Sequence, residues 1–448
     1  MIAIALCAAA FLACYWAGRR SLGQGLVVLL AFGYFYGILR ANLLTTFAHF
    51  IFDAGLLGLY LSFWNKSGSS RKSSTAARVW TLLLVLWPVM LVALPFQPLL
   101  VSLVGLRGNV FFIPLVWLAS QLKRKDLMEL AVGLALLDLV AFGFAVAEYF
   151  LGVPRFFPLS PVTQIMYASG DVAGGYLRIP STFTSAHAFG GTMVGTLPFL
   201  IGLWMEAEKR ILRILGVIGI PVVLMGMLMS ATRSNFIIAC GMVGFVLFKT
   251  KMKAPQRVFF VLIIGIVGYA ALSNARFQRF KSLDDADTIT ERIAGSVNRG
   301  FFEILTEYPM GNGLGGGGTS VPYFLEGQVR NPIGMENEYA RILSEQGIIG
   351  LLLWLSFLGW FFYQGRFAFS NGYWATSRRL TWCLTAIGFG TAWIGTGLLT
   401  SIPGTVLIMI GAGWPTSPPE PSEVMLTTRM RHPLQAVGRA TDVRILQR

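Results

Sequence analysis

Charged side chains are scarce in this sequence. They make up 13% of the 448 residues, whereas hydrophobic residues make up 55%. The polar stretch from Asn274 to Arg341 is therefore the largest segment expected to face water, and most of the remaining chain is expected to lie in a membrane. We expect any chemistry to take place in or beside this stretch.

Three further signals are absent. The four cysteines lie inside apolar runs without the spacing of metal ligands, which predicts packing roles and no metal site. No basic segment precedes the first apolar run; Arg19 and Arg20 follow it, which predicts a retained span and not a cleaved signal. The glycines at 315 to 318 are not followed by Gly-Lys-Ser/Thr, so they favour a turn over a phosphate-binding loop.

Long apolar runs, in contrast, are abundant. A helix needs about 20 apolar residues to cross a hydrocarbon core of about 30 Å, because every backbone N–H and C=O must be paired there. Such runs lie near 1 to 18, 23 to 39, 43 to 64, 79 to 95, 99 to 119, 127 to 150, 186 to 205, 211 to 229, 234 to 248, 256 to 272, 345 to 364 and 381 to 399, with a shorter one at 402 to 414. We predict an all-α, polytopic membrane bundle of 12 or 13 transmembrane helices.

Basic residues are distributed unevenly between the connections. Loops rich in Lys and Arg alternate with poor ones, which places the rich loops in the cytoplasm. The rich loops, with 19 Lys and Arg in all, are 19–20, 65–78, 121–126, 206–213, 249–257 and 365–380. Segments 151–185, 230–233 and 274–341 then lie outside. This topology explains the net charge of +15, so we expect no nucleic-acid partner.

The chain thereby divides into four parts. An N-terminal bundle of about ten spans covers 1–273, a large extracytoplasmic loop covers 274–341, and further transmembrane helices cover 342–414. The tail at 415–448 is basic, polar and rich in proline, and such a composition cannot bury a core. We expect this tail to be disordered in the cytoplasm.

The outer loop shows helical periodicity. From Ile289 to Tyr308 apolar residues recur every three or four positions, and Arg292, Arg299 and Glu303 belong to a polar stripe of the same period. This pattern predicts an amphipathic helix. The glycine-rich stretch from Pro309 to Gly318 is expected to end it in a mobile loop.

Helix is expected to resume from Met335 to Gln346. Glu338, Arg341 and Glu345 share one face of this helix and are able to pair with one another. Glu336 lies off that face and is freer to meet a substrate.

Several short stretches resemble the O-antigen ligase and O-antigen polymerase superfamily of bacterial envelopes. Glu336-Asn337, nine residues, then Gly347-x-x-Gly350 is similar to the family's His-Asn/Ser/Gln, nine residues, Gly-x-x-Gly motif. Glutamate in place of the ligase histidine, and Leu351 after the second glycine, favour the polymerase branch. Four other stretches are similar to family elements in the same order: Gly105 to Gly108, Arg178 to Phe183, Ser230 to Ser234 and Tyr308 to Gly315.

The resemblance implies a glycosyltransferase of the bacterial inner membrane that uses neither a metal nor another cofactor. Its implied donor is an undecaprenyl diphosphate-linked glycan, and its implied acceptor is a sugar hydroxyl of a second glycan, or a lipid. Membrane lipids and other polysaccharide-assembly proteins are further implied partners. The implied product is O-antigen or exopolysaccharide, made on the outer face.

Arginine suits this chemistry, because the leaving diphosphate gains negative charge. The planar guanidinium binds phosphate oxygens in pairs and never deprotonates. Arg178 and Arg233, both predicted at the outer surface, are the first candidates for binding the diphosphate. Arg292 and Arg299 of the predicted amphipathic helix are the second.

The attacking hydroxyl must also lose its proton to a base. Glu336 takes the position of the family's histidine and is the first candidate; the alternative is a carboxylate that stabilises a helix N-terminus. Glu338 is the second candidate, although its expected pairing with Arg341 weighs against it. Asn337 is expected to cap the helix more readily than to hold a sugar hydroxyl.

Charged residues inside predicted spans need a role, because each costs at least about 2.5 kcal/mol at the bilayer centre. Arg107, Asp53 and Asp138 are predicted at similar depth, which favours a structural ion pair among them. The alternative is that Arg107 lines the cavity that admits the diphosphate. His187, at the start of a span, is expected either to pack or to contact acceptor sugar.

Other functions remain open alternatives. A ligase that moves the glycan to a lipid or protein acceptor uses the same kinds of residue. A flippase also needs many spans, but its usual sign, an internal repeat with broken helices in matching halves, is not found. A purely structural envelope protein leaves Arg107 and the loop motifs unexplained. We therefore expect a polysaccharide polymerase.

Overall fold

The structure is a computed structural model and describes most of the chain up to residue 418. The described residues are 1–64, 75–168, 171–173, 176–249, 257–258, 261–262, 265, 268–269, 301–317, 321, 323–334, 337–395 and 397–418. This part is almost entirely helical, as predicted. The strands within it form one small antiparallel pair, β1 (Asp171–Ala173) and β2 (Tyr176–Leu177).

The helices follow one another with short connections. The first are α1 (Ile2–Arg20), α2 (Leu22–Tyr34), α3 (Tyr36–Asn42), η1 (Thr46–Phe50), α4 (Ile51–Trp64), α5 (Thr75–Leu91), α6 (Leu99–Val110), α7 (Pro114–Ala119) and α8 (Arg124–Leu151). After them come η2 (Val153–Arg155), α9 (Gln164–Ala168), α10 (Ala186–Glu206), α11 (Arg210–Met229), α12 (Arg233–Lys249), α15 (Phe301–Glu307), η4 (Tyr323–Gln328), α16 (Glu338–Ala368), α17 (Ala375–Thr391) and α18 (Gly404–Gly413).

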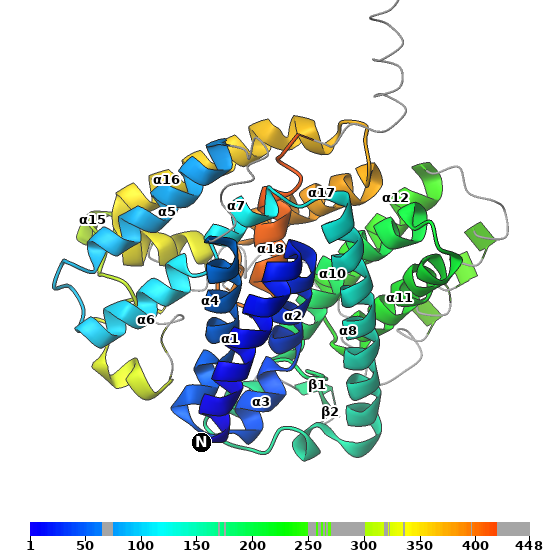
Figure 1. Cartoon of the computed structure of the whole chain (residues 1–448). Helices are drawn as coiled ribbons and strands as arrows, with labels where there is room; N and C mark the ends of the chain where they lie inside the picture. Colours follow the sequence, from blue (N-terminus) through cyan, green and yellow to red (C-terminus); the bar gives the residue numbers. More distant parts are fainter. Residues whose placement is uncertain are drawn as a thin grey trace, which may run out of the picture.

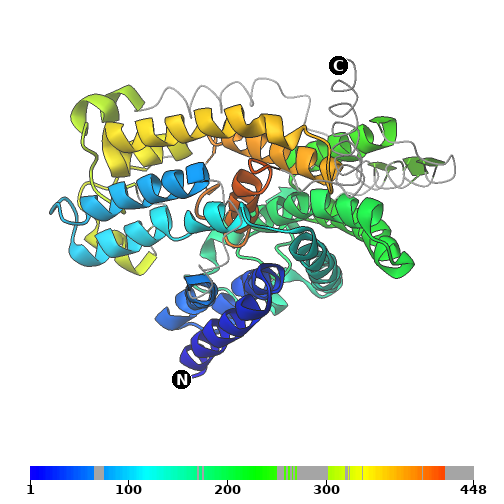
Figure 2. The same ribbon diagram turned by 45° about the horizontal axis from the view of Figure 1, so that its top comes forward.

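Two groups of helices lie at an angle to each other. Figure 1 shows α1, α2, α4 and α8 running side by side through the height of the molecule, with α10 and α11 next to α8. Helices α5, α6 and α16 form a second group, which Figure 2 shows as one stack. Helix α18 lies between the two groups and contacts α7, α10 and α17.

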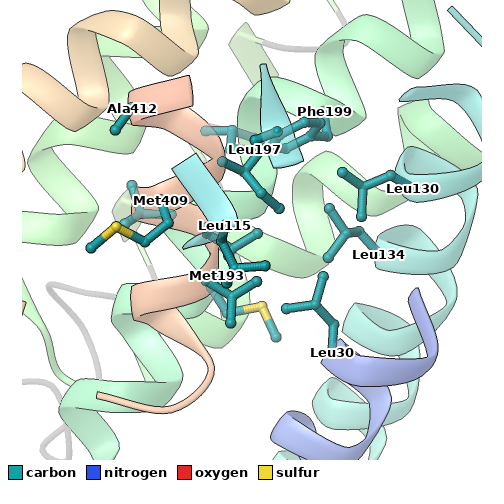
Figure 3. Packing of buried hydrophobic residues seen from close by; sticks show 14 of the residues in the cluster. Leu30, Leu115, Leu130, Leu134, Met193, Leu197, Phe199, Met409 and Ala412 are labelled. Carbon is teal, nitrogen blue, oxygen red and sulfur yellow. The ribbon is translucent and has the colours of Figure 1, made fainter. Parts of the chain in front are cut away.

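The core is centred on α10. Met193, Leu197 and Phe199 of this helix are fully buried. Figure 3 shows them among leucines of α2, α7 and α8 and beside Met409 and Ala412 of α18. Burial of such side chains stabilises the fold by roughly 1.5–3 kcal/mol each. Helix α10 is thereby fixed against both groups, and the candidate site begins at its N-terminus.

Seven segments of the described part are long and apolar enough to cross a membrane, or eight if α2 and α3, bent by 41°, form one span. These segments are Ile2–Arg20, Thr46–Phe63, Leu99–Ala119, Arg124–Leu151, Ala186–Glu206, Arg210–Met229 and Glu338–Ala368. Together with the apolar composition, they indicate a multi-pass membrane protein.

The remaining predicted spans are shorter than the sequence suggested. Helices α5, α12 and α18 fall below 18 residues, α17 ends at Thr391, and most of the predicted span 256–272 lies outside the described residues. Pro95 and Pro98 follow α5, and Pro403 directly precedes α18. Proline lacks the N–H that continues a helix, so apolar length alone overstated helix length.

Three of the basic loops meet at one end of the bundle. Arg124 pairs with Glu208 at 3.0 Å, which joins loop 121–126 to loop 206–213. The backbone N–H of Gly23 donates to the Asp126 carboxylate at 3.1 Å, which brings the end of α1 to the same place. The predicted topology requires this grouping, because all three loops were assigned to one face.

The start of the predicted disordered tail is ordered. Thr416 and Ser417 are buried, and the guanidinium of Arg378 donates to the carbonyl oxygens of Trp414 and Ser417. Residues 415–418 therefore belong to the folded part, because their polar groups find partners on α17 and α18. The rest of the tail lies outside the described residues.

Candidate functional site

A cleft of about 640 Å³ lies between α10, α12, α17 and α18. Its walls come from the starts of α10 and α12, from α17 and α18, and from the segment 392–401 that joins the last two. This volume is typical of small-molecule sites. The polar residues among its described walls are Ser185, His187, Ser234, Asn235, Thr391, Ser401 and Thr405.

The cleft is polar at one end and apolar further along. Ser185 and His187 line it where α10 begins, and Ser234 lines it where α12 begins. One to two turns further along these helices, the walls are Val194 and Ile238, together with leucines and isoleucines of α17 and α18. None of the described lining residues is charged. The shape therefore suits a ligand with a polar end and an apolar chain.

Two helix N-termini meet at the polar end. Ser185 caps α10, its Oγ accepting a hydrogen bond from the backbone N–H of Ala188 at 3.1 Å. Helix α12 begins with Arg233, which is half-buried. A helix N-terminus carries partial positive charge and favours anions, so a cation in its first turn is unfavourable unless an anion lies nearby. This end of the cleft is thus suited to a negatively charged group.

Arg178 connects these two helix starts. It is buried, and its Nε and Nη2 donate to the carbonyl oxygens of Ser230 and Ala231, at 3.2 and 3.3 Å, just before α12. Its Nη1 lies 2.8 Å from Nε2 of His187 on α10. The structure thereby brings together Arg178, His187 and the turn before Arg233, which the sequence suggested separately.

The contact with Arg178 also fixes the state of His187. A guanidinium only donates hydrogen bonds, so Nε2 of His187 accepts, and the neutral ring carries its proton on Nδ1. With the lone pair of Nε2 engaged, the exposed imidazole offers a donor to the cleft and not a base.

The turn from 230 to 233 packs tightly on α10. A Cβ on Gly190 would overlap with Oγ1 of Thr232, so glycine is required for this approach. Ala231 has a φ of +52°, a left-handed conformation that costs roughly 1–2 kcal/mol for a residue with a Cβ. The hydrogen bond from Arg178 to its carbonyl helps to hold this conformation.

The start of α16 holds the opposite wall of the cleft. Asn337 caps α16, its Oδ1 accepting from two backbone N–H groups at 2.9 and 3.2 Å, which confirms the predicted capping role. The backbone N–H of Glu338 donates to the carbonyl of Ala392 at 3.0 Å. Its Oε2 accepts from the backbone N–H of Gly397 at 2.9 Å. Ala392 and Gly397 both line the cleft.

Arg341 is the centre of a fully buried charge network behind that wall. It donates to Oε1 of Glu338 at 3.0 and 2.6 Å and to Oε2 of Glu345 at 3.0 Å, as predicted. It also donates to Oδ1 of Asn109 at 3.1 Å. Both carboxylate oxygens of Glu338 accept hydrogen bonds, so this side chain has the partners of a positioning residue and not of a base.

The glycine-rich segment was expected to be mobile, and this expectation is wrong. Residues 311–317 are buried between α6 and α16. The N–H of Asn312 donates to the carbonyl of Ser344 at 2.6 Å, and a Cβ on Gly105 would overlap with the backbone of Gly315. Glycine permits flexibility but also close contact between backbones, and the sequence does not distinguish the two.

The stretches that carry the family resemblance form two groups in space. Arg178 to Phe183 meets Ser230 to Ser234 at the cleft. Gly105 to Gly108 meets Tyr308 to Gly315, which in turn contacts Gly347 through Met310 and Pro309. Glu338 connects the second group with the wall of the cleft.

Arg107 lies away from the cleft. Its Nη2 pairs with Oδ1 of Asp53 at 3.0 Å and its Nε pairs with Oδ2, so the structural ion pair forms as predicted. Asp138 does not share this pair. It is fully buried and accepts a hydrogen bond from the hydroxyl of Tyr34 at 2.7 Å. Equal depth does not place charges on facing helix surfaces, and α8 presents Asp138 to α2.

Three predicted site residues, Arg292, Arg299 and Glu336, lie outside the described residues. Of the predicted amphipathic helix, α15 (Phe301–Glu307) is described. Ile304 is buried in it and Glu303 is exposed, as the periodicity predicted.

Sequence reasoning missed several buried polar residues. Gln346 donates to Asn109 at 2.8 Å and thereby joins the network of Arg341. Glu148 of α8 is buried and accepts from the backbone N–H of Ser181 at 2.9 Å. A polar side chain inside an apolar run signals a required partner, because its unpaired burial is costly. That signal was present for Asn109 and Glu148.

Comparisons with known proteins give no family: the chain matches no protein-family model, and no curated protein sequence matches it.

Proposed function

We propose that this chain is an integral-membrane glycosyltransferase that polymerises undecaprenyl diphosphate-linked repeat units, as in O-antigen or exopolysaccharide synthesis. One observation carries the proposal: the polar end of the cleft combines two helix N-termini with Arg178 and Arg233, and the rest of the cleft is apolar. A polyprenyl diphosphate has the same two parts, an anionic diphosphate and an apolar chain.

In this proposal the diphosphate lies at the polar end. Arg233 and the first N–H groups of α12 bind its oxygens, because both present positive charge there. Arg178 acts as a positioning residue that holds the turn before α12 and orients His187. The Nδ1–H of His187 donates to a sugar or phosphate oxygen. Arg292 and Arg299 remain candidates for further contacts.

The reaction is an attack of an acceptor hydroxyl on the anomeric carbon of the donor. A new C–O bond forms, the bond from the anomeric carbon to the diphosphate oxygen breaks, and the diphosphate leaves with the electron pair. The hydroxyl proton passes to a carboxylate, for which we propose Glu336. Fixed donors at the leaving group are worth about 3 kcal/mol each, on the order of a hundredfold in rate.

Glu336 is proposed because it directly precedes Asn337 and Glu338 in the chain, and these two residues lie at the start of α16, beside the cleft wall. Glu338 itself is assigned to positioning, since Arg341 and Gly397 occupy its oxygens. No metal takes part in the proposed step.

Deleting the gene and analysing lipid-linked glycans tests this function. Accumulated single repeat units support the polymerase, accumulated long chains indicate a ligase, and units trapped on the cytoplasmic side indicate a flippase. Either of the last two results overturns the proposal.

The two glutamates provide a matched pair for complementation of the deletion strain. Glu336→Gln is expected to abolish chain growth at normal protein level, whereas Glu338→Gln is expected to lower the protein level. Normal polymer from Glu336→Gln would remove this residue from the mechanism.

A further inference from the structure

A second cleft, of about 540 Å³, lies at the end of the bundle where the three basic loops meet. It is bounded by α1, α2, α8 and the start of α11. Its walls are mostly apolar, from Ala17, Val27, Val28, Met128, Val132, Gly133 and Leu212, and its polar residues are Arg20, Gln24 and Glu129. It is separate from the first cleft, since it shares no lining residue with it.

Close helix packing forms the floor of this second cleft. A Cβ on Gly133 of α8 would overlap with the side chain of Val27 on α2, so the two helices touch there. Glu129 has its partners within the wall. Its Oε1 accepts from Nε2 of Gln24 at 3.1 Å and lies 3.8 Å from Nζ of Lys125, and its Oε2 accepts from Ser21.

The charge around this cleft is strongly positive. The loops 19–20, 121–126 and 206–213 hold eight Lys and Arg against three Asp and Glu. Asp126 and Glu208 are engaged in contacts between these loops. Arg19 and Arg20 are both exposed, and of the two only Arg20 lines the cleft. An apolar groove therefore ends at an exposed guanidinium.

We infer that this cleft binds an anionic glycerophospholipid of the adjacent leaflet. Its phosphate lies at Arg20, and one acyl chain lies along Val27, Val28 and Val132. The argument is charge complementarity joined to shape: basic pockets between transmembrane helices attract anionic headgroups, and the apolar wall takes a chain that water-soluble anions lack. This inference does not depend on the proposed enzymatic function.

Native mass spectrometry of the full-length protein in a neutral detergent tests the inference. The probes are dioleoyl phosphatidylglycerol and dioleoyl phosphatidylcholine, titrated separately. We expect the anionic lipid to bind more tightly. Arg20→Gln is expected to weaken its binding about fivefold, the value of one basic side chain near a membrane surface, whereas the matched Arg19→Gln changes it less than about twofold.

A second variant tests the groove without changing charge. Val28→Trp places a large ring in the apolar wall and is expected to weaken binding of the anionic lipid at least about fivefold, with the thermal midpoint of the lipid-free protein unchanged. The inference is overturned if both lipids bind equally, if Arg19→Gln and Arg20→Gln act equally, or if glycerol phosphate displaces the lipid. Unchanged binding to Val28→Trp also overturns it, even where Arg20→Gln fails to fold.

Discussion

Two buried arginines of this protein have different partners. Arg341 donates to the carboxylates of Glu338 and Glu345 on its own helix and is completely enclosed. Arg178 donates to two backbone carbonyls and to a histidine that is exposed at the cleft. Carboxylates cancel the charge of a guanidinium, whereas carbonyls orient it without cancelling it. We conclude that Arg341 serves packing and that Arg178 serves the site.

The largest expected effect is on stability, at Arg341. Arg341→Met leaves two buried carboxylates without their cation, and breaking such a pair costs about 3–5 kcal/mol of unfolding free energy. Thermal unfolding of the purified protein in detergent measures the change. Arg366→Met, on an exposed turn of the same helix, is the control and should change stability by less than about 1 kcal/mol. Equal midpoints for the two variants would show that the buried network is not structural.

The next effect is on activity, at the cleft. Arg233→Ala is expected to lower the rate of chain elongation about a hundredfold in a reconstituted assay with lipid-linked repeat units, because one fixed cation at the leaving diphosphate is lost. The thermal midpoint should stay near that of the wild type. Arg210→Ala removes the matching first residue of α11, far from the cleft, and should keep full activity. Similar losses in both variants would contradict the assignment of Arg233.

A smaller effect is expected where α10 meets the turn before α12. Gly190→Ala forces a Cβ onto Thr232, and such overpacking costs about 1–3 kcal/mol. The added Thr232→Ala should restore most of the lost stability by making room. Gly191→Ala is the control, since its Cβ would lie 3.9 Å from the nearest atom, Nδ2 of Asn235. Equal destabilisation by the two single variants would argue against close packing at this turn.

The smallest effect concerns the cap of α16. Asn337→Ala removes the acceptor for two N–H groups and should lower stability by about 1 kcal/mol. Asn337→Ser keeps a capping oxygen and should remain close to the wild type. A drop of equal size for both variants would mean that the side chain of Asn337 has another role.

Local patterns in the sequence predicted much of this structure. The apolar runs gave most helices, since a helix pairs its own backbone groups in an apolar environment. Helical spacing gave the pairing of Glu338, Arg341 and Glu345 and the buried side of α15. The cap at Asn337 also follows from its neighbours alone. These features depend on residues close in the sequence.

Features that depend on distant contacts were not predictable in this way. The partner of Asp138, the packing of the glycine-rich segment and the wall formed by residues 392–397 all arise from elements far apart in the chain. Helix lengths near prolines also differed. The cleft itself was absent from the prediction, although His187 and Arg233, which mark its polar end, were named as candidates.

The most direct test of the central claim is the accessibility of Ser234, which is exposed at the polar end of the cleft. The variant Ser234→Cys, in a background whose native cysteines are replaced, is treated in intact cells with a membrane-impermeant maleimide. The proposed mechanism predicts labelling from outside, and less labelling when the lipid-linked donor accumulates. Labelling that requires permeabilised cells would contradict it.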